Sequence, residues 1–178
     1  MKNYNTKKST MEKSSNTAIS YNSFQLYGLV TLRVLIGWHF LYEGISKLTN
    51  PYWSSAAFLL ESKWILSGWA DSIVANPSLV TIVDFLNIWG LTVIGLGLMC
   101  GCLARWASIA GMVLLGLYYL VNPPFIGFQY SAPTEGSYLI VNKNLIEMAA
   151  LYILIVFPTS TIIGIDRLIF KKNSEYKS

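Results

Sequence analysis

The chain has 178 residues, of which 53% are hydrophobic and only 12% are charged. Its mean hydropathy of +0.46 is too high for a water-soluble fold, and the apolar residues come in continuous blocks, which indicates lipid as the solvent. The net charge of +4 does not indicate a nucleic-acid-binding protein, because the lysines lie in the two tails and form no basic stripe among aromatics.

The chain begins with a polar segment that is rich in Lys, Ser and Asn, and we expect residues 1–23 to be a disordered cytosolic tail. Four apolar segments follow, each close to the ~20 residues needed to cross ~30 Å of hydrocarbon. They cover residues 24–48, 79–99, 103–121 and 144–165. The sequence therefore predicts an all-α, integral membrane four-helix bundle over residues 24–170, followed by a basic cytosolic tail, residues 171–178.

The predicted helices are joined by unequal connections. Residues 50–78, between the first two helices, contain three tryptophans among apolar and polar residues. This composition predicts an interfacial or re-entrant helix in the first outer loop. A tight turn joins the second and third helices. The last connection opens with Asn122-Pro123-Pro124 and is rich in Gly and Pro, so we expect an ordered loop there.

Lysines and arginines predict the orientation, because cytosolic loops carry an excess of both. With the N-terminus in the cytosol, nine of these residues are cytosolic, whereas Lys47, Lys63 and Lys143 face outward and Arg33 lies within the membrane. We therefore expect a multi-pass protein of a bacterial or archaeal cytoplasmic membrane. Both termini would be cytosolic, and the two long loops would face the periplasm.

Ionisable and amide residues inside these helices are candidates for a functional site, because an unpaired charge in a bilayer is costly. In chain order they are Arg33, His39, Glu43, Lys47, Asp84, Asn87, Asn142, Lys143, Asn144 and Glu147. At a rise of about 1.5 Å per residue, Glu43, Asp84 and Glu147 lie at a similar depth below the outer ends of their helices. Lys47 and Lys143 lie just above them.

Two interpretations of this polar layer stay open. The charges can neutralise one another and fix the register of the helices, or they can line a polar pocket that opens to the periplasm. In the second case Glu43, Asp84 and Glu147 are the candidate catalytic, proton-handling groups. The other polar residues are then candidates for binding substrate or a quinone head group.

Other kinds of chemistry have weaker support. His39 is the single histidine of the chain, so we expect neither a His-ligated haem nor a multi-His metal site. Cys100 and Cys102 would face a reducing compartment, and we interpret them as small buried residues and not as a redox pair. The sequence contains no phosphate-binding glycine loop and no nucleophile triad.

Several segments resemble a known family. The run from Leu32-Arg33 through Gly37-Trp38-His39-Phe40-Leu41-Tyr42-Glu43-Gly44 to Lys47-Leu48 resembles the first helix of the DoxX/DoxD family. Four later segments are similar to its DoxD branch. They are Asn122-Pro123-Pro124, Glu135-Gly136-Ser137-Tyr138-Leu139, Val141-Asn142-Lys143-Asn144-Leu145-Ile146-Glu147, and Pro158-Thr159 with Gly164-Ile165-Asp166. The resemblance covers about residues 24–170 and implies a four-helix membrane bundle.

The resemblance also implies an activity, that of a membrane subunit of thiosulfate:quinone oxidoreductase. That enzyme oxidises thiosulfate to tetrathionate and passes the electrons to quinone, and it needs a second subunit of the DoxA type. The implied partners are therefore the lipid bilayer, quinone and a DoxA-like or other periplasmic protein. The family's Arg, Glu, Lys and Asn-Lys-Asn positions match Arg33, Glu43, Lys47 and residues 142–144. The resemblance assigns no catalytic role to these positions.

The leading hypothesis is a membrane subunit of a quinone-linked oxidoreductase. Lys47 and Lys143 would attract an anionic substrate such as thiosulfate, and the three carboxylates would handle the protons of quinone reduction. The alternative is a non-catalytic membrane anchor or assembly partner of a periplasmic redox protein. A small-solute carrier is a third reading, which the absence of an inverted repeat or broken helix pair disfavours.

Overall fold

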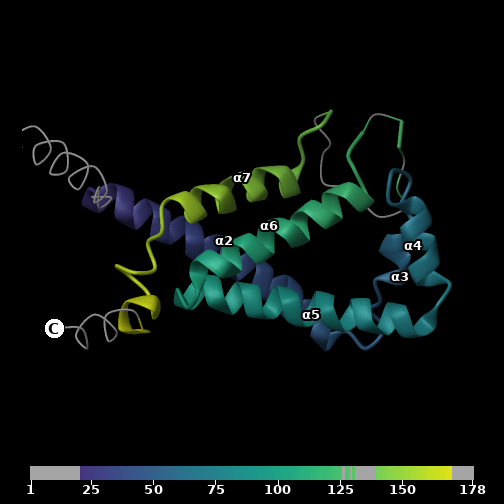
Figure 1. The fold of residues 1–178 in the computed structure, drawn as a ribbon, viewed down its shortest axis with the longest axis horizontal. Helices are drawn as coiled ribbons and strands as arrows, with labels where there is room; N and C mark the ends of the chain where they lie inside the picture. The colour runs from purple at the N-terminus through teal and green to yellow at the C-terminus, as the bar shows by residue number, and fades with distance from the viewer. Residues whose placement is uncertain (1–20, 126, 129, 131–138, 170–178) are drawn as a thin grey trace, which may run out of the picture.

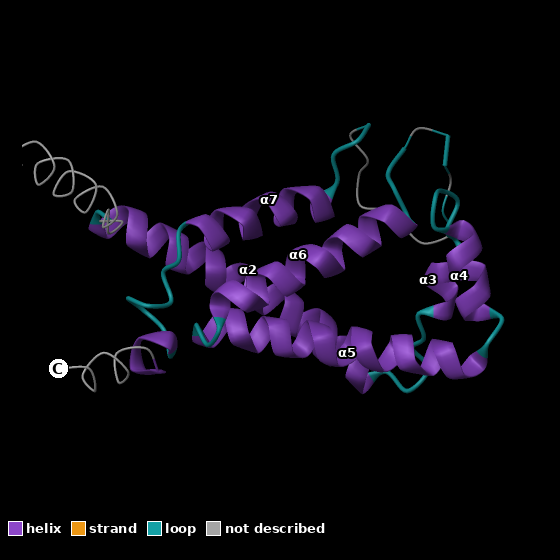
Figure 2. Cartoon of the chain, viewed as in Figure 1, coloured by secondary structure: helices purple, strands orange, loops and turns teal. Residues whose placement is uncertain are grey.

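The computed structural model of the protein describes residues 21–125, 127–128, 130 and 139–169 (Figure 1). Residues 1–20 of the predicted N-terminal tail, the predicted C-terminal tail and the Glu135–Tyr138 part of the family resemblance lie outside this range. The described elements are all helices (Figure 2).

Four helices form the body of the molecule. They are α2 (Ser23–Thr49), α5 (Pro77–Cys100), α6 (Ala104–Val121) and α7 (Lys143–Val156). Helix α2 packs against α5 and α7, and α6 packs against the same two helices. Helices α2, α5 and α6 are long and apolar enough to cross a membrane. The predicted all-α membrane protein is therefore confirmed.

The first long loop contains two short helices, α3 (Ala56–Leu60) and α4 (Ser67–Val74), at one end of the bundle (Figure 1). Buried Leu59, Ala70 and Ile73 pack with Val121 at the end of α6, and form a small second core. We call this end of the bundle the loop end, and the opposite end, which carries the α5–α6 turn, the turn end. The main core lies between the four long helices and consists of Ile36, Phe40, Leu91, Ile94, Leu98, Leu115, Leu151 and Leu154.

Glycines bring α2 and α5 into backbone contact. A Cβ atom on Gly37 would lie 2.8 Å from the backbone nitrogen of Met99, and one on Gly44 would lie 2.8 Å from that of Thr92. A Cβ atom on Gly95 would lie 2.8 Å from the carbonyl oxygen of Gly37. Small residues permit this kind of close helix approach in membranes, where packing must replace the hydrophobic effect. The α2 face with the two glycines is thus the face that meets α5.

The fourth long helix is shorter than the predicted range 144–165. Helix α7 ends at Val156, two residues before Pro158, because proline cannot donate a backbone hydrogen bond and restricts the residue before it. The chain then passes to the α5–α6 turn, where the backbone nitrogens of Ile165 and Asp166 donate to the carbonyl oxygens of Cys100 (3.1 Å) and Gly101 (2.9 Å).

Asp166, from the segment after α7, caps the start of α6 at the α5–α6 turn. Its carboxylate accepts hydrogen bonds from the backbone nitrogens of Leu103 (2.6 Å) and Ala104 (3.2 Å) at the start of α6. Leu103 has a φ of 48°, in the left-handed region that non-glycine residues rarely adopt, and its own side chain cannot cap the helix. Asp166 is 3% exposed and therefore takes the place of the missing N-cap.

Replacing Asp166 by alanine removes both acceptors and leaves the N–H groups at the start of α6 without partners. We expect the free energy of unfolding to fall by about 2 kcal/mol, measured by thermal or denaturant unfolding in detergent micelles. Asp71→Ala is the control, because Asp71 is an exposed acidic residue of α4. Equal stability of the two variants would contradict the capping role.

Gly95→Ala tests the contact between α2 and α5. The added methyl group would collide with the backbone of Leu41 and the carbonyl oxygen of Gly37, so we expect a loss of about 1–3 kcal/mol in stability from overpacking. Gly90→Ala on the same helix is the matched control, since a Cβ atom there has nothing within 4 Å. The thermal unfolding midpoints of both variants, compared with the wild type, decide the question.

Candidate functional site

A cavity of about 780 Å³ lies at the loop end, bounded by all four long helices and the loops around α3. Small-molecule sites in proteins have volumes of roughly 300–1,000 Å³, so this cavity is large enough for a ligand. Its aromatic lining consists of Tyr52, Trp53, Phe58, Tyr118, Phe125, Phe128 and Tyr130. Its polar lining consists of Glu43, Lys47, Asn50, Ser54, Ser55, Glu61, Asn87, Asn122, Asn142, Lys143 and Asn144.

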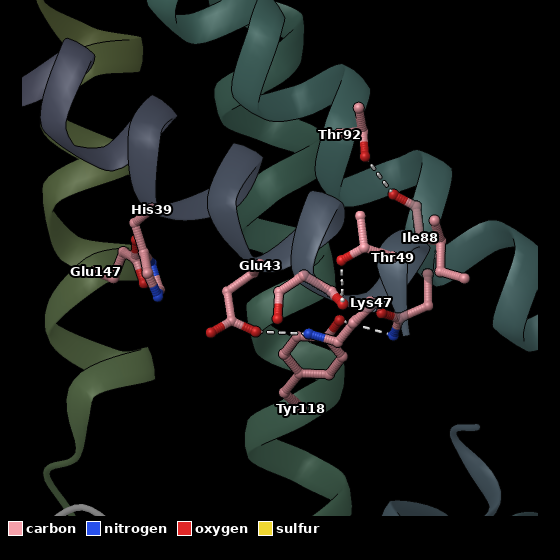
Figure 3. A network of polar contacts seen from close by, with 10 residues as sticks. His39, Glu43, Lys47, Thr49, Ile88, Thr92, Tyr118 and Glu147 are labelled. Carbon is pink, nitrogen blue, oxygen red and sulfur yellow. Dashed lines mark hydrogen bonds and ion pairs between the residues drawn. The ribbon is translucent and has the colours of Figure 1, made fainter. Parts of the chain in front are cut away.

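An ion pair on α2 forms part of the cavity wall. The Nζ atom of Lys47 donates to Oε2 of Glu43 at 2.6 Å (Figure 3), across one helical turn. The same ammonium group lies 5.5 Å from the ring centroid of Trp53, which is within the range of a cation–π contact. Glu43 also interacts electrostatically with His39 and Lys143. Its carboxylate therefore connects the cavity wall with the interior of the bundle.

A second polar pair joins α2 to α7 behind this wall. Nδ1 of His39 lies 2.7 Å from Oε1 of Glu147, whose side chain is 9% exposed. Neither residue is among those that line the cavity. Among the described residues, the remaining polar atoms of the pair, Nε2 of His39 and Oε2 of Glu147, are buried without a hydrogen-bond partner. In Figure 3, Glu43 lies between this pair and Lys47.

A third polar contact joins α5 to α6 at the cavity. The Nδ2 atom of Asn87 donates to the hydroxyl oxygen of Tyr118 at 2.7 Å. The ring of Phe58 stands edge-on to that of Tyr118, with 5.7 Å between the centroids. Sequence reasoning did not select Tyr118, because it is one aromatic residue among many. Its position one helical turn before Asn122, in the Asn-Pro-Pro segment, is the signal that could have indicated it.

Asp84 and Asn142, two candidates from the sequence, both accept hydrogen bonds from backbone nitrogens, and Asp84 does not line the cavity. Oδ1 of Asp84 accepts a hydrogen bond from the backbone nitrogen of Ser55 at 2.7 Å, so this carboxylate fixes the segment that leads into α3. Asn142 lines the cavity only at the start of α7, where its Oδ1 accepts from the backbone nitrogen of Leu145 at 3.1 Å and caps the helix. Lys143 and Asn144 follow it in the lining.

Arg33 lies at the turn end, far from the cavity lining. It is 3% exposed, and its guanidinium group donates to Oγ1 of Thr159 (3.1 Å) and to the carbonyl oxygen of Ile163 (2.7 Å). Asp166 is close enough to interact with it electrostatically. Arg33 therefore anchors the segment after α7. The nearby thiols of Cys100 and Cys102 are free, and Cys100 is exposed and Cys102 partly exposed, so the prediction that both are buried is wrong.

Tyr130 contributes to the cavity lining from the loop. Burial raises the pKa of its hydroxyl and the charge of Glu61 raises this pKa further, so the phenol is neutral at physiological pH. Its hydroxyl donates to the carbonyl oxygen of Pro123 at 2.7 Å, and the Nζ atom of Lys63 lies 5.4 Å from its ring centroid. The described part of the loop is thereby tied to the Pro-Pro segment.

A family model described as DoxX matches residues 28–123, which is more than half of the chain. The protein belongs to the DoxX family. Comparison with curated proteins and with solved structures gave no match. The part of this DoxX protein that matches runs from α2 to the end of α6, so Glu43, Lys47, Asn87 and Tyr118 all lie inside it. Glu147 lies outside it, and the DoxD branch remains a prediction.

The contact between His39 and Glu147 predicts a defined imidazole state. A carboxylate can only accept a hydrogen bond, so we expect the proton of this contact to lie on Nδ1. His39 is the single histidine, and ¹⁵N-labelled histidine therefore gives one pair of ring signals, whose shifts report the tautomer. In Glu147→Leu we expect the preference for a proton on Nδ1 to be lost. Identical ring shifts in both proteins would contradict the pairing.

Proposed function

We propose that this DoxX protein is the membrane subunit of a quinone-linked oxidoreductase and that its cavity binds the quinone head group. One observation carries the proposal: an aromatic-lined cavity adjoins a carboxylate, Glu43, that also interacts electrostatically with the half-buried His39, the partner of buried Glu147. Aromatic side chains can pack against a planar quinone ring. Carboxylates and histidine are the side chains that most often transfer protons, and quinone reduction consumes two protons with two electrons.

The proposal extends to an anionic electron donor of the thiosulfate class. Lys47 and Lys143 place positive charge at the cavity, and the resemblance to the DoxD branch supports the same donor. The reaction balances when two thiosulfate ions form tetrathionate and release two electrons, while one quinone takes up these electrons and two protons to become quinol. In this proposal the loop end faces the periplasm, where a DoxA-like subunit would supply the thiosulfate chemistry.

We call Glu43, Glu147, Lys47, Lys143 and His39 the polar cluster. Its carboxylates and its histidine have different roles in the proposal. Glu43 would exchange protons with the bound quinone, because it lines the cavity and contacts Lys47. The His39–Glu147 pair would hold a proton in reserve one helical turn away. Asp84, which the sequence placed in the same role, has its carboxylate bonded to the Ser55 backbone, so we propose that it shapes the loop.

Glu147→Gln tests the proton-handling role. The amide keeps the size of the side chain but cannot take up a proton, so we expect the rate of decylubiquinone reduction by thiosulfate to fall at least about a hundredfold. The assay uses purified protein in lipid nanodiscs, with and without a co-expressed DoxA-like subunit. Asp71→Asn is the matched control, because this exposed carboxylate of α4 lies outside the cavity. An unchanged rate in Glu147→Gln would remove its assigned role.

The alternative function is a membrane anchor or assembly partner of a periplasmic redox protein. The loop end offers a docking surface for it, since Leu60, Ile65 and Trp69 of the α3–α4 region are exposed. Mass spectrometry of the protein purified in mild detergent separates the two functions. Bound quinone supports the oxidoreductase subunit, whereas a stoichiometric partner without bound quinone supports the anchor.

A further inference from the structure

We infer that Tyr118, positioned by Asn87, donates a hydrogen bond to a carbonyl oxygen of the bound quinone. This inference rests on the proposed function and names the residue that recognises the head group. Tyr118 would be the residue that touches the ligand, and Asn87 would be a positioning residue that acts through it. The sequence-based candidates do not include Tyr118.

The hydrogen bonding of Tyr118 leaves its proton available. A phenol has one proton to donate and lone pairs with which to accept. The hydroxyl oxygen accepts from Nδ2 of Asn87 at 2.7 Å, and among the described residues it donates to no acceptor. Because Tyr118 lines the cavity, a ligand oxygen there can receive the unused proton.

Three other polar groups of the cavity lining each donate a hydrogen to an acceptor within the protein. Lys47 donates to the carboxylate of Glu43, and the hydroxyl of Tyr130 donates to the carbonyl oxygen of Pro123. The amide of Asn122 donates to the carbonyl oxygen of Phe58. Among these four groups, Tyr118 is the one that donates no hydrogen within the described part of the chain. The buried hydroxyl of Ser55, which also lines the cavity, has no hydrogen-bond partner there either.

The ring of Tyr118 is held in a fixed orientation. Phe58 packs edge-on against one side of it at 5.7 Å, and Asn87 fixes the hydroxyl end. Tyr118 also interacts electrostatically with Glu43, and Figure 3 shows it beside the Glu43–Lys47 pair. A carbonyl oxygen bound at Tyr118 would therefore lie close to the carboxylate that we propose to exchange protons with the quinone.

Binding of decylubiquinone to the protein in nanodiscs tests this inference. Tyr118→Phe removes only the hydroxyl, and we expect the affinity to fall about fivefold, the value of one hydrogen bond between neutral groups. Tyr119→Phe is the matched control, because the hydroxyl of Tyr119 donates to the carbonyl oxygen of Ile140 and the residue does not line the cavity. We expect its affinity to equal that of the wild type.

Infrared difference spectra give a readout that a purely structural role would not change. A hydrogen bond lowers the stretching frequency of a quinone carbonyl, so one carbonyl band of decylubiquinone should be shifted down in the wild type. In Tyr118→Phe this band should return to the frequency of a carbonyl without the hydrogen bond. In Asn87→Leu its downward shift should be smaller than in the wild type. Replacing Tyr118 by 3-fluorotyrosine, which preserves the packing but gives a more acidic phenol, should shift it further down.

The outcomes separate this inference from the proposed function. If the wild type binds decylubiquinone and neither the phenylalanine nor the fluorotyrosine variant changes the carbonyl band, Tyr118 is not the donor, whereas the proposed function stands. If the wild type binds no decylubiquinone, both are overturned. A fivefold loss in Tyr118→Phe together with the band shifts supports the inference.

Discussion

The backbone contact between α2 and α5 determines where the polar groups of the loop end lie. Gly44 follows Glu43 directly in the sequence, and its Cα packs against the backbone of Thr92, little more than one turn from Asn87. This register sets Glu43 and Asn87 on the same cavity wall. A larger residue at Gly44 or Gly95 would separate the helices, and the Asn87–Tyr118 contact would no longer lie beside the Glu43–Lys47 pair.

Polar groups in the membrane helices are used differently at the two ends. At the turn end, Arg33 and Asp166 bond to backbone atoms and to Thr159, so they hold the segment after α7 against the α5–α6 turn. At the loop end, three pairs of side chains bond to one another, and two of these pairs line a cavity. The candidate site therefore lies at the loop end.

Sequence hydrophobicity was sufficient to place the four long helices, because it depends on local composition. The end of α7 was predicted nine residues too late, at residue 165 instead of Val156, although Pro158 is visible in the sequence. The contacts of individual side chains could not be predicted. His39 lies one turn from Glu43 but bonds to Glu147, and Asp84 bonds to a loop nitrogen. Such choices depend on which helices become neighbours, and composition gives no access to that.

The charge of the polar cluster links proton handling to the binding of an anion. Glu43 and Glu147 carry two negative charges, and Lys47 and Lys143, both near Glu43, carry two positive ones. The formal charges of these four groups cancel, and Glu61, which also lines the cavity, adds one negative charge. In the proposed function, a proton taken up by the cluster makes the cavity less negative, and an anionic donor is then bound more readily. Transfer of that proton to a reduced quinone restores the earlier charge. In the proposed function, the same proton would therefore favour donor binding before electron transfer and donor release after it.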